Sequence, residues 1–172
     1  SWSKGDVVRI ATDASSDTVF KGSMCFVAGN GDYRLRTRET KASTDELELE
    51  ALTLALKYLL KVGARKAVIE SDSVAALEAV EQIVHKRGSK ASRPGRTWRG
   101  VSSGARSRFQ QAWGDIQGQC EVDIRRVLGH AGDPLNRAAD QIAYMGLRAI
   151  AHPMKQSRET LREGIQKALL AL

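Results

Sequence analysis

Apolar and polar positions divide the first third of the chain into three predicted strands. The first is an apolar run that ends at Asp13, and the small polar residues 14–17 after it predict a turn. The sequence Gly-Asn-Gly-Asp over 29–32 is typical of a hairpin turn, because glycine and asparagine tolerate positive φ. Three hairpin-linked strands are therefore expected, over 7–12, 19–28 and 33–40.

Helical periodicity and short apolar runs alternate over the rest of the chain. A helix is expected from Thr44 to about Val62, because Gly63 suits a left-handed C-cap. Asp133 followed by Pro134 is typical of a helix start, and this helix should reach about Ile150. The other helices are expected over 73–85, 106–116 and 158–172, and the other strands over 66–71 and 122–128.

This order predicts an α/β fold. Three antiparallel strands followed by β-α-β units give a mixed five-stranded sheet with helices on both faces and an extra C-terminal helix. The length of 172 residues, with 42 % hydrophobic and 27 % charged content, suits one globular domain. We expect a catalytic domain over 1–150, with a C-terminal helical extension over 151–172.

Composition also bears on location. No apolar run approaches the roughly 20 residues of a membrane helix, and the polar start over 1–6 does not resemble a signal peptide. Cys25 and Cys120 form neither a metal-binding spacing nor a disulfide framework, so both are interpreted as reduced packing thiols. A cytoplasmic protein without membrane association, and a monomer, is expected.

Positive charge is concentrated in one segment. The chain carries a formal net charge of +7, and residues 86–108 contain eight basic residues and no acidic residue. Such a block favours docking of a polyanion, although a solvated, disordered loop is the alternative. The basic residues are Lys86, Arg87, Lys90, Arg93, Arg96, Arg99, Arg106 and Arg108.

Helical periodicity separates the glutamates of the first predicted helix. Glu48 falls on the apolar face, where an unpaired charge is costly to bury, so it is a candidate metal ligand. Protonation, or a hydrogen bond to the backbone, is the alternative. The opposite, solvent-facing stripe is predicted to hold Glu46, Glu50, Thr53, Lys57 and Lys61.

Three aspartates complete a candidate site. Asp13 and Asp72 each follow an apolar strand, at the edge where α/β sheets bind ligands, and the helix of Asp140 can pack beside them. Individually, each has an ordinary alternative as a turn, cap or surface residue. Together with Glu48 they form a repelling cluster that needs cations, and carboxylates favour Mg²⁺ or Mn²⁺. Two such ions can promote phosphodiester hydrolysis.

Four motifs, in the same order along residues 7–150, resemble those of ribonuclease HI. They are Ile10-Ala11-Thr12-Asp13, then Leu47-Glu48-Leu49-Glu50-Ala51 with Ala55-Leu56, then Ile69-Glu70-Ser71-Asp72-Ser73, and last Leu128-Gly129-His130-Ala131-Gly132-Asp133-Pro134 with Asn136 and Ala139-Asp140. The last motif is the most specific of the four.

The resemblance implies a ribonuclease H-like fold with a catalytic, metal-binding set of Asp13, Glu48, Asp72 and Asp140, which would hold two Mg²⁺ ions with Mn²⁺ as a substitute. His130 would be a mobile histidine that assists proton transfer or product release, with a surface loop histidine as the alternative. The basic segment 86–108 would correspond to the family's positively charged handle.

The resemblance also implies contacts to nucleic acid. They are expected from Ser15, Ser43 and Asn136 and from Lys86, Arg87, Lys90, Arg93, Arg96 and Arg99. The family's Asn and Gln groove readers are replaced by Thr44, Asp45 and Val74. The leading hypothesis is a metal-dependent endoribonuclease that hydrolyses the RNA strand of RNA–DNA hybrids. A DNA-cutting nuclease of the same fold and a non-cleaving nucleic-acid-binding module are the alternatives.

Overall fold

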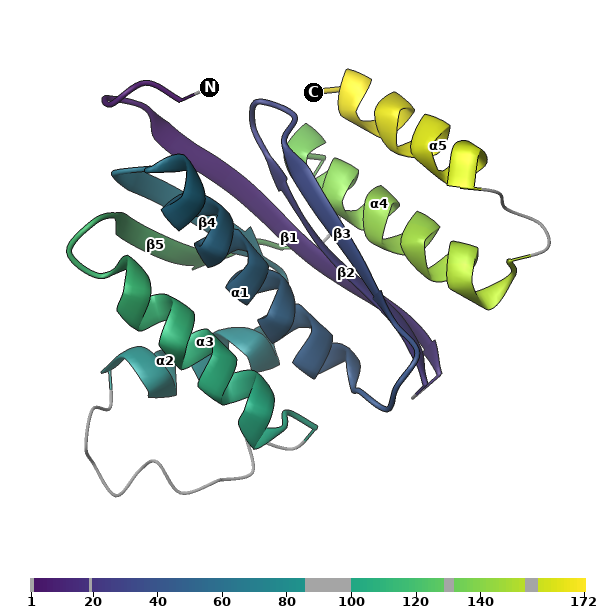
Figure 1. The fold of residues 1–172 in the computed structure, drawn as a ribbon, viewed down its shortest axis with the longest axis horizontal. Coiled ribbons are helices and arrows are strands. Elements are labelled where there is room, and N and C mark those ends of the chain that lie inside the picture. Colours follow the sequence, from purple (N-terminus) through teal and green to yellow (C-terminus); the bar gives the residue numbers. More distant parts are fainter. Residues whose placement is uncertain (1, 19, 86–99, 129–131, 154–157) are drawn as a thin grey trace.

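A mixed five-stranded sheet forms the centre of the molecule. The computed structural model describes residues 2–18, 20–85, 100–128, 132–153 and 158–172 (Figure 1). The strand order is β3-β2-β1-β4-β5, antiparallel from β3 to β1 and parallel from β1 to β5. The predicted mixed sheet of three antiparallel strands followed by β-α-β units is confirmed. The elements are β1 Val7–Thr18, β2 Lys21–Ala28, β3 Tyr33–Arg38, α1 Thr44–Val62, β4 Lys66–Ser71, α2 Val74–His85, α3 Ser103–Ile116, β5 Glu121–Arg126, α4 Pro134–Ala151 and α5 Arg158–Leu170.

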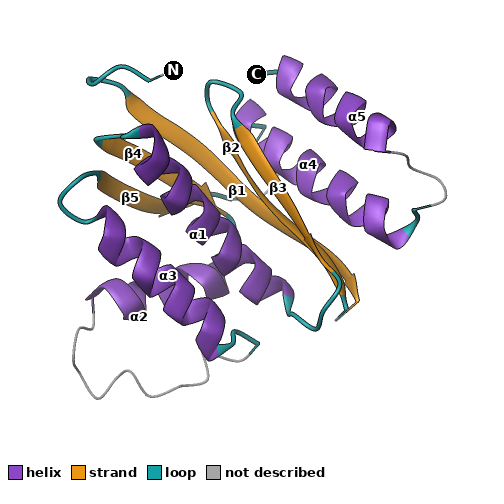
Figure 2. Ribbon diagram, viewed as in Figure 1, coloured by secondary structure: helices purple, strands orange, loops and turns teal. Residues whose placement is uncertain are grey.

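Helices cover both faces of this sheet, with α1, α2 and α3 on one face and α4 and α5 on the other (Figure 2). Alternate residues of each strand point to opposite faces and supply two separate cores. Ile10 packs in the core under α1, whereas its neighbour Ala11 packs in the core under α4. In the described part of the chain, no helix has the length and apolar character needed to cross a membrane.

Local capping chemistry sets the ends of α1 and the start of α4, the helices that carry Glu48 and Asp140. The Ser43 side chain accepts a hydrogen bond from the Glu46 N–H at the start of α1, and Gly63 ends that helix with φ +69°. Asp133 caps α4 by accepting a hydrogen bond from the Leu135 N–H, and proline occupies the first helical position. The helix ends predicted at Gly63 and Asp133 are confirmed.

Strand β1 is longer than predicted, and the turn expected over 14–17 is wrong. The strand continues beyond Asp13 to Thr18 and pairs with β2, with Asp13 opposite Cys25 and Ser16 opposite Gly22. Two tertiary contacts accompany the extension. The Ser16 and Thr44 hydroxyls lie 2.5 Å apart and form a hydrogen bond, and a Cβ at Gly22 would overlap the Leu47 side chain.

The predicted polar stripe of α1 is only partly exposed to solvent. Glu46 and Thr53 are 3 % and 5 % exposed, because α3 and the segment before it cover this side of the helix. The Glu46 carboxylate accepts hydrogen bonds from the Ser102 N–H at 2.7 Å and from the Arg38 guanidinium at 3.1 Å. The solvent-face prediction is therefore wrong for Glu46 and Thr53.

Candidate active site

Parallel pairing of β1 with β4 places two aspartates side by side. Ala11 lies opposite Glu70 in this pairing, and each of Asp13 and Asp72 follows two residues later in its own segment. Asp72 comes directly after the end of β4, whereas Asp13 lies within the extended β1. The two carboxylates therefore meet at the edge formed by the carboxyl end of β4.

Glu48 reaches the same point from the buried side of α1. Carboxylate oxygens of Asp13, Glu48 and Asp72 all lie within 4.8 Å of one another. Glu48 is only 5 % exposed, and within the described structure its Oε2 atom has no hydrogen-bond partner. A buried carboxylate oxygen without a partner is costly, so this atom is available to a cation.

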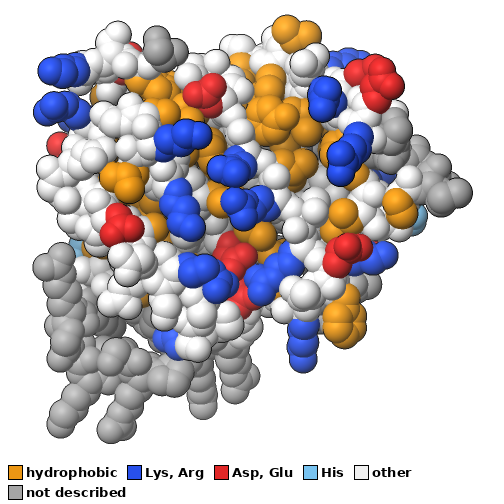
Figure 3. All heavy atoms as spheres, in the orientation of Figure 1, with side chains coloured by type: hydrophobic (Ala, Val, Ile, Leu, Met, Phe, Trp, Pro, Cys, Tyr) orange, Lys and Arg blue, Asp and Glu red, His pale blue; other side chains and the backbone are white. Residues whose placement is uncertain are grey.

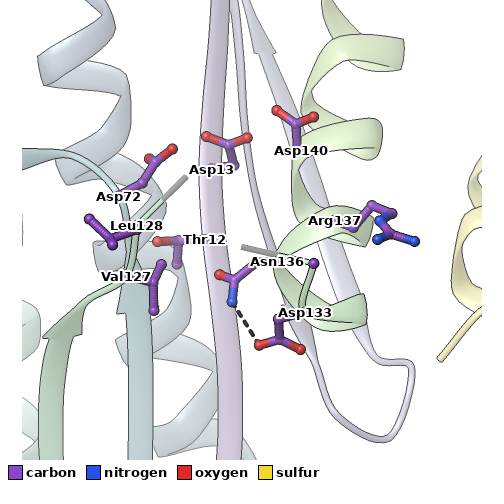
Figure 4. A pocket seen from close by; sticks show the side chains of 10 residues that line it. Thr12, Asp13, Asp72, Val127, Leu128, Asp133, Asn136, Arg137 and Asp140 are labelled. Atoms are coloured by element: carbon purple, nitrogen blue, oxygen red, sulfur yellow. Dashed lines mark hydrogen bonds between the residues drawn. The ribbon is translucent and has the colours of Figure 1, made fainter. Parts of the chain in front are cut away.

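Asp140 joins the site from α4, two turns into that helix. Its side chain lines the same cavity of about 280 Å³ as those of Asp13 and Asp72 (Figure 4). Other lining residues come from β1, from the segment after β5 and from the start of α4; they are Thr12, Val127, Leu128, Gly132, Asp133, Asn136 and Arg137. The four predicted carboxylates thus surround one region, and three of them form the 4.8 Å group.

Burial and mutual repulsion make these carboxylates difficult to ionise. Desolvation, followed by the negative charge of Asp72 and a hydrogen bond and charge from Asp140, raises the pKa of Asp13 to about 7. Burial first, and then the charges of Asp13 and Asp72, raises the pKa of Glu48 well above its ordinary value. A bound cation would relieve both penalties. The crowded oxygens and the unpartnered Oε2 atom therefore fit a hard divalent cation.

A network of charged and amide side chains underlies the cavity. Arg9 of β1 donates from Nε to Glu70 at 2.5 Å and also pairs with Asp133. Asn136 donates to Asp133 at 2.8 Å (Figure 4). The network joins β1, β4 and the first turn of α4, three of the elements that carry the aspartates. Neither Arg9 nor Glu70 was among the predicted site residues, although Glu70 lies two residues before Asp72 near the end of β4, and this spacing was a usable signal.

The residues expected to contact nucleic acid are only partly described. Ser43 caps α1 and donates its hydroxyl hydrogen to the Gly100 carbonyl, and Ser15 is half-buried in β1. Arg108 pairs with Glu50 of α1. His130 lies outside the described residues, as do the basic residues Lys86, Arg87, Lys90, Arg93, Arg96 and Arg99.

Comparisons with known proteins bear on the fold and the family of the chain. Among solved structures, the N-terminal RNase H domain of rv2228c from Mycobacterium tuberculosis, determined as a fusion with maltose binding protein, matches with a TM-score of 0.62 at 18 % identity. The match covers 86 % of this chain and 97 % of that one, and it shows the same fold. No curated protein sequence matches the chain. The RNase H family model matches residues 5–148, and the chain therefore belongs to the RNase H family.

Proposed function

We propose that this protein is a metal-dependent endoribonuclease that hydrolyses the RNA strand of RNA–DNA hybrids. Membership of the RNase H family supports a nuclease that acts on hybrids in general. The observation that carries the more specific proposal is the group of Asp13, Glu48 and Asp72, with oxygens within 4.8 Å and one Glu48 oxygen unpartnered. Carboxylates crowded in this way serve to hold cations beside a scissile phosphodiester.

In this proposal Asp13, Glu48, Asp72 and Asp140 hold Mg²⁺, or Mn²⁺ in its place. A pair of such ions, when bound, activates a water molecule and stabilises the leaving oxygen of a phosphodiester. The protein contributes the fixed positions of the carboxylates. Asp13 is held within a paired strand, where its Oδ1 accepts from the Ala14 N–H at 2.9 Å, and Glu48 is held within a packed helix. His130, which precedes α4 in the sequence, would move a proton or help the product leave.

Two further regions complete the proposal. The catalytic domain would span 1–150, and residues 151–172 would be an extension in which α5 packs on α4 through Ile165 and Ala168. The basic segment 86–108 would grip the duplex outside the cut site, since its charges are suited to backbone phosphates. The protein would act as a monomer.

A cleavage assay with three substrates tests this function. The protein should cut the RNA strand of a labelled hybrid in Mg²⁺ and leave duplex RNA and duplex DNA intact. Cleavage of duplex DNA would instead identify a DNA-cutting nuclease of this fold. Binding of the hybrid without cleavage would identify a non-cleaving module.

Two variants on one helix assign the role of Glu48. Glu48→Gln should abolish cleavage, because it removes a charge from the group of three carboxylates. The matched variant Glu50→Gln, two residues away but paired with Arg38 and Arg108, should keep cleavage near the wild-type rate.

Asp13→Asn should abolish cleavage and leave hybrid binding intact or tighter, because it removes a negative charge that faces phosphate. Activity of Asp13→Asn within about tenfold of wild type would refute the assignment.

A further inference from the structure

The edge strand β3 carries arginines that stand beside α1. In the pairing of β2 with β3, Phe26 lies opposite Arg34 and Met24 lies opposite Arg36. Met24 and Phe26 both pack in the core under α1, so the two arginines point to the same face of the sheet. Because the two arginines are two residues apart on a strand, their positions along it are separated by about 6.6 Å.

Helix α1 adds two lysines to this surface. Lys57 and Lys61 are exposed and four residues apart, which places them on one side of the helix. Together with Arg34 and Arg36 they line a groove of about 720 Å³ between α1 and β3. Lys and Arg side chains gather over α1 and β3, in the middle of Figure 3. Leu54 and Tyr58 also line it.

Positive charge in the groove is not neutralised within the described structure. None of Arg34, Arg36, Lys57 and Lys61 forms an ion pair with another described residue. The single acid among the described residues of the lining is Asp32, which accepts a hydrogen bond from the Tyr58 hydroxyl at 2.5 Å. Four cations therefore face one anion that is already bonded.

Protection of the sheet edge does not account for this arrangement. Charged side chains on an edge strand discourage pairing with another sheet, which explains arginines on β3. It does not explain why α1 directs two lysines to the same groove. Unpaired cations on two facing elements instead match an anionic ligand that lies between them.

We propose that the β3–α1 groove binds the phosphates of a single nucleic-acid strand. Arginines repeated along a strand match a repeating anion, and guanidinium groups suit phosphate oxygens. The groove is distinct from the candidate active site, because β2 separates β3 from the strand that carries Asp13. This proposal requires no cleavage, so it stands or fails separately from the proposed function.

Binding of labelled oligothymidylate, measured by fluorescence anisotropy at several salt concentrations, tests the groove. This probe contains no RNA. The groove variant replaces four lining cations by glutamine, and a control variant removes the same charge from exposed positions outside the groove. The groove variant is Arg34→Gln, Arg36→Gln, Lys57→Gln and Lys61→Gln, and the control variant is Lys4→Gln, Arg65→Gln, Arg162→Gln and Lys167→Gln.

The groove variant should bind about tenfold more weakly than the control variant at low salt. The slope of its log binding constant against log salt concentration should be shallower by up to about three, because each single-strand phosphate contact contributes about 0.7 to that slope. Circular dichroism melting checks that all three proteins are folded. Equal loss in the two variants would reduce the effect to net charge and overturn the proposal. Competition by polyglutamate as strong as that by unlabelled oligothymidylate would overturn it in favour of an acidic polypeptide.

Discussion

Replacing Asp13 by asparagine should stabilise the metal-free protein at neutral and alkaline pH. Asp13 is 8 % exposed and lies beside Glu48 and Asp72. Burial and the neighbouring carboxylates raise its pKa from 3.8 to about 7. The folded protein therefore holds a proton that the unfolded chain has already lost, and stability must fall as the pH rises through this window.

The size of the effect follows from the shift. A rise of about three pKa units corresponds to about 4 kcal/mol, at 1.36 kcal/mol per unit. This contribution is fully present below pH 3.8, declines between pH 4 and 7, and is lost above pH 7. An asparagine amide does not ionise, so the free energy of unfolding of Asp13→Asn should exceed that of wild type by up to about 4 kcal/mol at pH 8, and by only about 1 kcal/mol at pH 4.5.

Denaturant unfolding in EDTA at the two pH values measures this difference. Asp17→Asn, an exposed change on the same strand, is the matched control and should alter stability little at either pH. Added Mg²⁺ should stabilise the wild type more than Asp13→Asn, because a ligand of the folded state raises the free energy of unfolding. Equal or lower stability of Asp13→Asn at pH 8 would refute the electrostatic account of the site.

Three other predictions concern the surroundings of the site. Glu46→Gln should lower the free energy of unfolding by about 1.5–3 kcal/mol, measured by denaturant unfolding, because a buried, charge-assisted contact with Arg38 is weakened. Its kcat should change little. His130→Ala should slow single-turnover cleavage on the order of 10²-fold or less while Mn²⁺ still binds in a calorimetric titration; complete loss of Mn²⁺ binding would make His130 a ligand. Replacing Arg93, Arg96 and Arg99 together by alanine should raise KM and leave kcat nearly unchanged. In kinetics at several salt concentrations, the slope of log KM against log salt concentration should become shallower by up to about three. An unchanged slope would mean that the duplex binds elsewhere.

Most of the element order could be predicted because it depends on local chemistry. Apolar periodicity identified the strands and helices, and apart from β1 their ends agree with the structure to within three residues. The start of α4 at Asp133 was visible because a capping side chain bonds to the backbone two or three residues away. The apolar side of α1 also placed Glu48 correctly among buried residues.

The errors arose where a partner lies far away in the chain. Small polar residues after Asp13 are typical of a turn, but pairing with β2 keeps them in a strand. Glu46 occupies a polar stripe of α1, yet the backbone of Ser102, 56 residues later, donates to it and allows its burial. Periodicity identifies the buried face of an isolated helix, and it carries no information about a second element that packs over the other face.

The sequence by itself therefore determined which segments form strands and helices, how those helices begin and end, and which acidic residues are candidates for the site. Tertiary structure alone decided their geometry. The register of β1 against β4 brings Asp13 beside Asp72, and α1 brings Glu48 to the same point, where one of its oxygens has no partner within the described structure. The physical reason is range: propensity and capping act over a few residues, whereas desolvation and charge repulsion depend on groups brought together by the whole fold.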